Sequence, residues 1–132
     1  MAGEIRVPIE RESDIVVARQ RGRSLAAELG FSSCDQTLIA TAISEIARNI
    51  LTYATKGEVS LSAIKNGQHC LSITAVDEGP GIANLDQAMQ NGYSTAGSLG
   101  LGLPGAKRMM DEFEISSEPG KGTIVRMKKW KH

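Results

Sequence analysis

The chain has 132 residues, with 15 basic and 15 acidic side chains that give a formal net charge of zero. This length predicts a single domain spanning residues 1–132. The balanced charge argues against nucleic acid or an anionic membrane as the main partner. No run of about 18 apolar residues occurs, so we expect a cytoplasmic protein without a membrane span.

The first part of the chain predicts a strand and then a helix. Apolar and polar residues alternate over residues 4–10, which indicates a half-buried strand, and Pro8 favours an edge position. A helix is expected from an N-cap at Ser13 to a C-terminal glycine at Gly30.

A second, longer helix carries the first candidate site residues. Ser33 and Gln36 form a capping-box pattern, and apolar residues recur at helical spacing up to Ala54. Glu45 and Asn49 lie four residues apart at the border of this apolar stripe, which suggests that they face a crevice. An asparagine oxygen can bind Mg²⁺, and a glutamate one turn away can act as a base. Taken alone, the pair is more typical of ordinary hydrogen bonding on a helix surface.

The second half of the chain predicts a hairpin, a long loop, a helix and another hairpin. The dipeptide Asn66-Gly67 is typical of a tight turn between strands. Glycines and Pro80 mark an irregular segment over residues 78–100, which we expect to be a functional lid. The elements expected around them are strands at 58–65 and 69–77, a helix at 101–113, and strands at 113–117 and 123–130. This order favours a two-layer α/β sandwich with a mixed, mainly antiparallel sheet covered by helices.

The segment from Asp77 to Gly81 is the second candidate. Asp77 continues the apolar face of the strand before it, so its carboxylate is aimed at the end of an apolar pocket. A buried carboxylate needs a hydrogen-bond donor, which the amino group of adenine could provide. Gly79 and Gly81 would let the backbone approach the ring closely, although the pattern also fits a turn that closes a strand.

A glycine-rich segment at the start of the third expected helix is another candidate. Free N–H groups and the helix dipole at a helix N-terminus favour anions, so this segment predicts a phosphate cradle. The expected cradle residues are Gly97, Gly100, Leu101, Gly102 and Leu103. Residues 100–105 match G-x-G-x-x-G, but no strand precedes them, so we reject a dinucleotide-binding domain.

Thr123 follows a glycine at the start of the last expected strand. Its side chain lies on the apolar face of that strand, so its hydroxyl could support Asp77. A threonine after a turn is also an ordinary β-former, so this signal is weak by itself.

The order of these motifs is more specific than any one of them. A helical Glu-x-x-x-Asn, then Asp-x-Gly-x-Gly, a glycine-rich helix entry and Gly-Thr resemble the N, G1, G2 and G3 boxes of the GHKL ATPase and kinase family, over about residues 34–130. Segments 43–49, 77–82 and 100–111 are similar to the serine/threonine switch kinases of bacterial stressosomes. The resemblance implies a Bergerat ATP-binding fold and Mg²⁺-dependent transfer of the ATP γ-phosphate to a protein serine or threonine.

The resemblance also implies roles for single residues. Glu45 would be the general base and Asn49 the Mg²⁺ ligand, while Asp77 would accept a hydrogen bond from adenine, supported by Thr123. The remaining residues would surround the nucleotide, with Gly79 and Gly81 at the adenine and Gly100 and Gly102 at the phosphates.

The chain departs from the family pattern at one point. Related anti-sigma kinases carry a lid arginine for the γ-phosphate, whereas residues 82–103 contain no Lys or Arg. Lys107 or Arg108 in the next helix could substitute.

The implied partners are proteins. The substrate would be a STAS-domain antagonist or scaffold protein of a stressosome, and release from it would free the kinase for a downstream effector. A rival is a nucleotide-regulated anti-sigma or adaptor protein that transfers no phosphate. A histidine-kinase catalytic domain is disfavoured, because the sequence has two histidines and no dimerisation helix with a phospho-acceptor.

Overall fold

The computed structural model describes residues 4–54, 56–65, 67–79, 102–118 and 120–131. Its helices are α1 (Glu12–Glu28), α2 (Ser33–Tyr53) and α4 (Gly102–Met109). Its strands are β1 (Ile5–Ile9), β2 (Gly57–Ile64), β3 (Cys70–Asp77), β4 (Glu112–Glu118) and β5 (Gly122–Trp130). Most of the expected lid, together with Gly81, Gly97, Gly100 and Leu101, lies outside the described residues.

The strands form one five-stranded sheet in the order β1-β2-β3-β5-β4. The sheet was expected to be mixed and mainly antiparallel, and every pair of neighbouring strands in the described part is antiparallel. The strand β1 lies at one edge, as predicted from Pro8, because proline cannot donate a ladder hydrogen bond.

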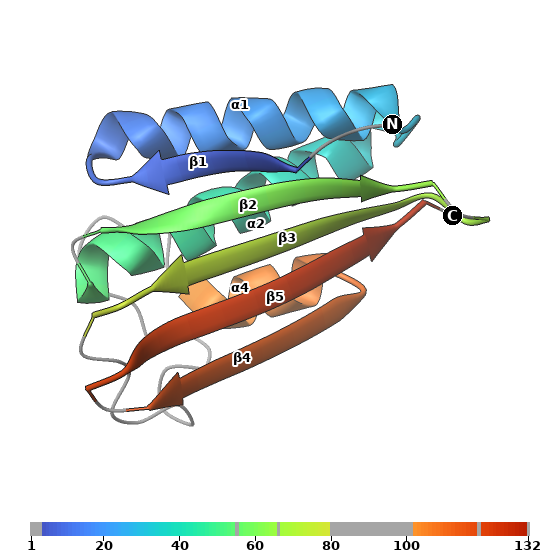
Figure 1. Ribbon diagram of the computed structural model, residues 1–132. Coiled ribbons are helices and arrows are strands. Elements are labelled where there is room, and N and C mark those ends of the chain that lie inside the picture. The colour runs from blue at the N-terminus through green and yellow to red at the C-terminus, as the bar shows by residue number, and fades with distance from the viewer. Residues whose placement is uncertain (1–3, 55, 66, 80–101, 119, 132) are drawn as a thin grey trace.

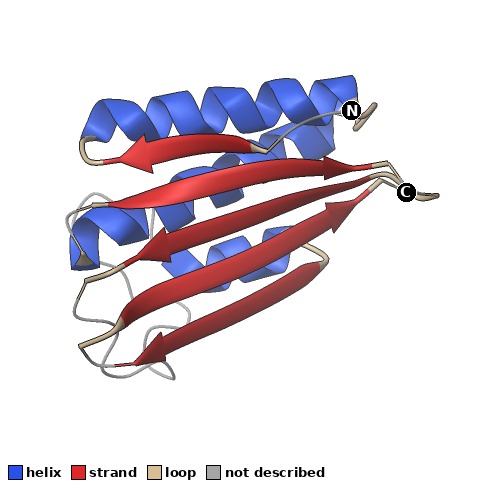
Figure 2. Ribbon diagram, viewed as in Figure 1, coloured by secondary structure: helices blue, strands red, loops and turns tan. Residues whose placement is uncertain are grey.

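The three described helices cover one face of this sheet (Figures 1 and 2). Alternate strand residues and the apolar stripe of α2 meet between the two layers, since both elements have an apolar side to bury. The largest fully buried side chains include Ile9, Leu29, Ile39, Ile43, Ile46, Ile50, Leu61, Leu71, Ile73 and Met127. The predicted two-layer α/β sandwich is therefore confirmed.

The start of α1 differs from the prediction. Its N-cap is Arg11, and the Asp14 carboxylate accepts hydrogen bonds from the backbone N–H groups of Glu10 (2.9 Å) and Arg11 (3.2 Å). The expected N-cap at Ser13 is wrong, because an acid in the first turn already binds the free N–H groups. The end is as predicted, since Gly30 follows the helix with a φ of 87°.

The helix α2 begins one residue earlier than its capping pattern predicted. The Ser32 hydroxyl oxygen accepts from the Asp35 N–H at 3.1 Å, so Ser32 and not Ser33 is the N-cap. The Gln36 side chain reaches back past the N-cap and donates to the Phe31 carbonyl oxygen at 2.9 Å. Within the described ranges, no helix is long and apolar enough to cross a membrane.

The helix α4 ends at Met109, before the expected end at Phe113. Phe113 lies in β4 and is paired with Met127 of β5. The Lys129 ammonium group reaches from β5 and donates to the Met109 carbonyl oxygen at 3.1 Å. The helix therefore ends where strand pairing and a lysine cap satisfy its last backbone groups better than another turn would.

Candidate nucleotide-binding site

One row of residues crosses the sheet where the site was expected. Ser117 of β4 is paired with Thr123 of β5, Thr123 with Asp77 of β3, and Asp77 with Gly57 of β2. Side chains alternate along strands, so the buried Asp77 and Thr123 point to the helix side together with the core residues. The row lies at the end of the sheet where α2 ends and α4 begins (Figure 1). The tertiary structure thus brings Asp77 and Thr123 side by side, as expected.

The Asp77 carboxylate is buried, with 6% of the residue exposed. Its Oδ1 atom accepts a hydrogen bond from the Gly79 N–H at 3.0 Å. Burial raises the pKa of Asp77, and the backbone N–H groups of Gly79 and Thr123 partly oppose this by stabilising the charged form. The result is a desolvated carboxylate with further acceptor capacity, which suits a ligand that brings an N–H donor.

Close packing of glycines holds Asp77 against the end of α2. A β-carbon on Gly57 would stand 2.8 Å from the Ile50 side chain and 3.0 Å from the Asp77 β-carbon. A β-carbon on Gly79 would stand 2.6 Å from the Ala54 α-carbon, which follows the last turn of α2. Neither position has room for a side chain, so the backbone around Asp77 is fixed by contact with α2.

Glu45 and Asn49 lie in the second half of the same helix. Glu45 is buried, with 7% of the residue exposed, and Asn49 is half-buried. Asn49 directly precedes Ile50, whose side chain packs over Gly57, the β2 partner of Asp77. The structure therefore places the Glu-Asn pair and Asp77 on two elements in direct contact, and Glu45 is withdrawn from bulk solvent.

The start of α4 is the part of the expected phosphate cradle that the structure describes. The helix begins at Gly102, and Leu103 is buried in the core with 4% of the residue exposed. The Leu103 side chain therefore anchors α4, and only its backbone could face a phosphate. Lys107 and Arg108 lie in the last turn of α4, about 8 Å along the helix axis from its start.

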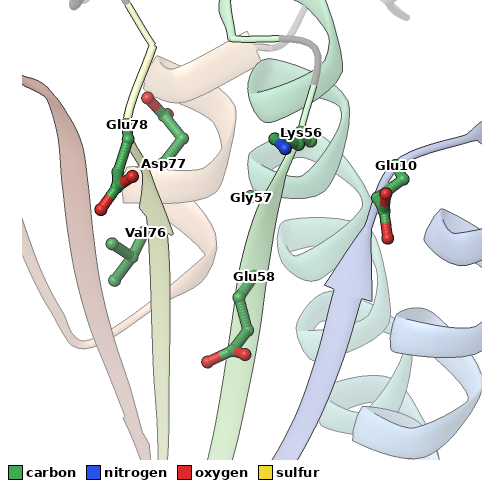
Figure 3. Close-up of a pocket in the computed structure, with 7 residues that line it drawn as sticks. All are labelled: Glu10, Lys56, Gly57, Glu58, Val76, Asp77 and Glu78. Carbon is green, nitrogen blue, oxygen red and sulfur yellow. The ribbon is translucent and has the colours of Figure 1, made fainter.

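A hollow of about 440 Å³ opens beside Asp77, at the start of β2 and the end of β3 (Figure 3). It is lined by Glu10, Lys56, Gly57, Glu58, Val76, Asp77 and Glu78. The side chains of Asp77 and Glu78 point in opposite directions in this view, as expected for consecutive residues of an extended chain. Among the predicted site residues that the structure describes, only Asp77 lines the hollow, so the hollow by itself does not define the nucleotide site.

Sequence reasoning missed Ser117 and Gly57, the two neighbours of the Thr123–Asp77 pair in the row. The Ser117 hydroxyl lies 2.8 Å from the Thr123 hydroxyl and donates to the Gly122 carbonyl oxygen at 3.2 Å. Counting outward from the predicted turn between the last two strands could have paired Ser117 with Thr123. No comparable signal pointed to Gly57, because its importance depends on the contact with α2.

Comparison with known proteins agrees with this geometry. Residues 34–131 match the family described as histidine kinase-, DNA gyrase B-, and HSP90-like ATPase. The chain is 51% identical over 125 residues to the serine/threonine-protein kinase RsbT of Bacillus subtilis (strain 168), with 94% of each chain covered. It is 35% identical over 97 residues to the anti-sigma F factor of Thermoanaerobacter sp. (strain X514), covering 70% of this chain and 68% of that protein.

Two solved structures share the fold at low sequence identity. The RsbU and RsbW domains of Rv1364c from Mycobacterium tuberculosis match with a TM-score of 0.64 and 18% identity, over 97% of this chain and 32% of that one. The SiaB–SiaC complex from Pseudomonas aeruginosa matches with a TM-score of 0.56 and 15% identity, over 97% of this chain and 89% of that one.

The chain belongs to the histidine kinase-, DNA gyrase B-, and HSP90-like ATPase family, and the expected GHKL fold is confirmed. Within that family it belongs with the serine/threonine-protein kinase RsbT, to which half of its residues are identical over nearly the whole length. This membership confirms the expected enzyme class, an ATP-dependent protein serine/threonine kinase.

Proposed function

We propose that this kinase transfers the ATP γ-phosphate to a serine or threonine of a STAS-domain protein and thereby switches between protein partners. The observation that carries the proposal is the contact between the Asp77 end of β3 and the helix that bears Glu45 and Asn49. A base-recognition group and a catalytic pair on touching elements suit one nucleotide bound between them.

The described residues fit an adenine nucleotide. Asp77 offers a buried acceptor, and Gly57 and Gly79 leave no room for a side chain beside it. An adenine amino group is a donor on a flat apolar ring, which is the chemistry that a buried acceptor requires. The N-terminus of α4 lies at the same end of the sheet and is suited to phosphate oxygens.

Glu45 and Asn49 would carry out the transfer. Bound Mg²⁺-ATP supplies the phosphoryl group and neutralises its charge. The Asn49 amide oxygen would hold the metal, since Mg²⁺ prefers oxygen ligands and keeps water or phosphate oxygens in its other positions. Glu45 would take the proton of the attacking hydroxyl, and its burial keeps that carboxylate out of bulk water.

The proposed protein partners rest on the relatives. RsbT is a serine/threonine-protein kinase by name, and several relatives are named anti-sigma F factors. A STAS-domain scaffold or antagonist of a stressosome would be the phosphate acceptor. Phosphorylation would then weaken that complex and release the kinase to a downstream effector.

The similarity to anti-sigma F factors also supports the second candidate, a nucleotide-regulated anti-sigma or adaptor protein without phosphoryl transfer. The two candidates differ in one reaction. The kinase requires a base at Glu45, whereas a binding protein requires only that nucleotide changes its affinity for the partner.

A transfer assay distinguishes them. The purified chain is incubated with radiolabelled ATP, Mg²⁺ and a panel of STAS-domain proteins, and label on each protein is followed over time. Transfer to a serine or threonine of one STAS protein supports the kinase. Nucleotide-dependent binding of such a protein without any transfer would favour the adaptor.

A further inference from the structure

The Thr123 hydroxyl beside Asp77 belongs to a short chain of hydrogen bonds that ends on the backbone. Ser117 Oγ lies 2.8 Å from Thr123 Oγ1 and 3.2 Å from the Gly122 carbonyl oxygen. Register places Ser117, Thr123 and Asp77 in one row across β4, β5 and β3. Ser117 is half-buried and Thr123 is buried, with 4% of the residue exposed, so water competes weakly for these bonds.

The direction of the protons follows from the acceptor at the end of the chain. A carbonyl oxygen can only accept, so the single hydroxyl proton of Ser117 points to Gly122. Either hydroxyl could donate in the 2.8 Å contact, and with the Ser117 proton on Gly122 we assign the donor role to Thr123. Thr123 Oγ1 is left with lone pairs toward its remaining neighbours. Its neighbour Asp77, when ionised, is also an acceptor only.

We infer that Ser117 is a specificity-determining positioning residue, which orients the Thr123 hydroxyl so that Thr123 and Asp77 present only acceptors to the purine. This inference rests on the proposed adenine site. An all-acceptor corner attracts the amino group of a 6-aminopurine. It repels the carbonyl oxygen of a 6-oxopurine, because that oxygen and the oxygens of Thr123 and Asp77 are all acceptors and no proton lies between them.

Ser117→Ala tests this inference. The Thr123 hydroxyl loses its acceptor and becomes free to turn its proton toward a 6-oxo group. Dissociation constants for ATP and inosine triphosphate are measured by calorimetry with Mg²⁺, using the full chain. The preference for ATP over inosine triphosphate should fall by about five- to tenfold, which corresponds to one net hydrogen bond.

The matched control is Ser116→Ala, the exposed neighbour on the opposite face of β4, which should leave the preference unchanged. Ser117→Thr keeps a hydroxyl and should keep the preference. Ser117→Cys, whose sulfur is only a weak acceptor for the Thr123 proton, provides a second test if the alanine variant folds poorly.

The inference requires that Ser117 changes the nucleotide preference only through Thr123. A double variant therefore separates loss of the Thr123 hydroxyl orientation from a general disturbance of the site. Thr123→Val should itself lower the preference, and adding Ser117→Ala to it should change the preference no further. An unchanged preference in Ser117→Ala and Ser117→Cys, or an additional loss in the double variant, would overturn the inference. If either of these contrary results is found while the unmodified chain binds ATP selectively, only the inference fails. If it binds neither nucleotide, the proposed function fails as well.

Discussion

A β-carbon on Gly122 would overlap the carbonyl oxygen of Asp77. Gly122 opens β5 with a φ of 90°, and its backbone lies against the end of β3. The positive φ and the short distance together mean that only glycine fits at position 122 without strain. Gly122 thereby positions Asp77 at the end of β3.

We therefore expect Gly122→Ala to damage both stability and nucleotide affinity. Gly120→Ala is the matched control, because Gly120 has a φ of 82° in the same turn but nothing within 4 Å of a β-carbon. The control should lose roughly 1–2 kcal/mol from the left-handed conformation alone. Gly122→Ala should lose more and should also bind ATP more weakly. Urea unfolding and ATP titration measure the two effects, and equal losses in both variants would contradict the steric argument.

Glu45→Gln should retain ATP binding and lose most phosphoryl transfer. The amide has the size of the carboxylate but cannot take a proton, and removal of a general base slows reactions by about 10²- to 10⁴-fold. Glu58→Gln is a suitable control, since Glu58 lies in β2 on the face opposite the helices. Rates are compared at saturating ATP with the proposed STAS-domain substrate. Near-normal transfer by Glu45→Gln would remove Glu45 from the base role.

Asp77→Asn should weaken ATP binding, because the new amide can present a donor to the adenine amino group. The same substitution should not lower the free energy of unfolding of the ligand-free protein at neutral pH and should tend to raise it. Burial raises the pKa of Asp77 above its ordinary value of 3.8, so the folded state holds the proton more tightly than the unfolded state. The contribution of Asp77 to stability is then largest below that ordinary value and falls as pH rises through the raised pKa.

The asparagine variant lacks this titration. At neutral pH its free energy of unfolding should equal or exceed that of the unmodified protein, and the difference should shrink on acidification toward pH 3.8. Urea unfolding at a series of pH values gives the comparison. The prediction would be contradicted if the variant were less stable than the unmodified protein at neutral pH and the difference in unfolding free energy then moved in its favour on acidification.

Lys129→Met should loosen α4. The buried Lys129 ammonium group donates to the Met109 carbonyl oxygen at the C-terminus of that helix, where a cation also interacts favourably with the helix dipole. Loss of the bond should cost about 1–2 kcal/mol of unfolding free energy. Lys128→Met, on the opposite face of β5, is the control. Equal stabilities of the two variants would show that the cap contributes nothing measurable.

Local sequence patterns predicted most elements and the inward direction of the Asp77 side chain. The apolar stripe from Ile39 to Ile50 determined the long helix, and the alternation that ends at Asp77 determined that its carboxylate points inward. Both signals depend on residues that are near one another in sequence, so periodicity alone reveals them.

The helix ends and the finer parts of the site depended on tertiary contacts. Ser32 and Ser33 are equivalent as capping residues in the sequence, and only the folded structure shows that Ser32 is the N-cap. The end of α4 at Met109 was decided by Lys129, which lies in another element. Such contacts join groups whose proximity exists only once the sheet has formed.

The sequence by itself predicted which residues would carry the chemistry, namely the helical Glu45 and Asn49 and the carboxylate of Asp77, and it determined that this carboxylate points inward. Only the tertiary structure decided which groups surround them. The pairing of β3 with β5 and of β5 with β4 sets Asp77, Thr123 and Ser117 in one row. That register is fixed by the burial of whole strand faces against α2 and α4, a long-range requirement that no local pattern encodes.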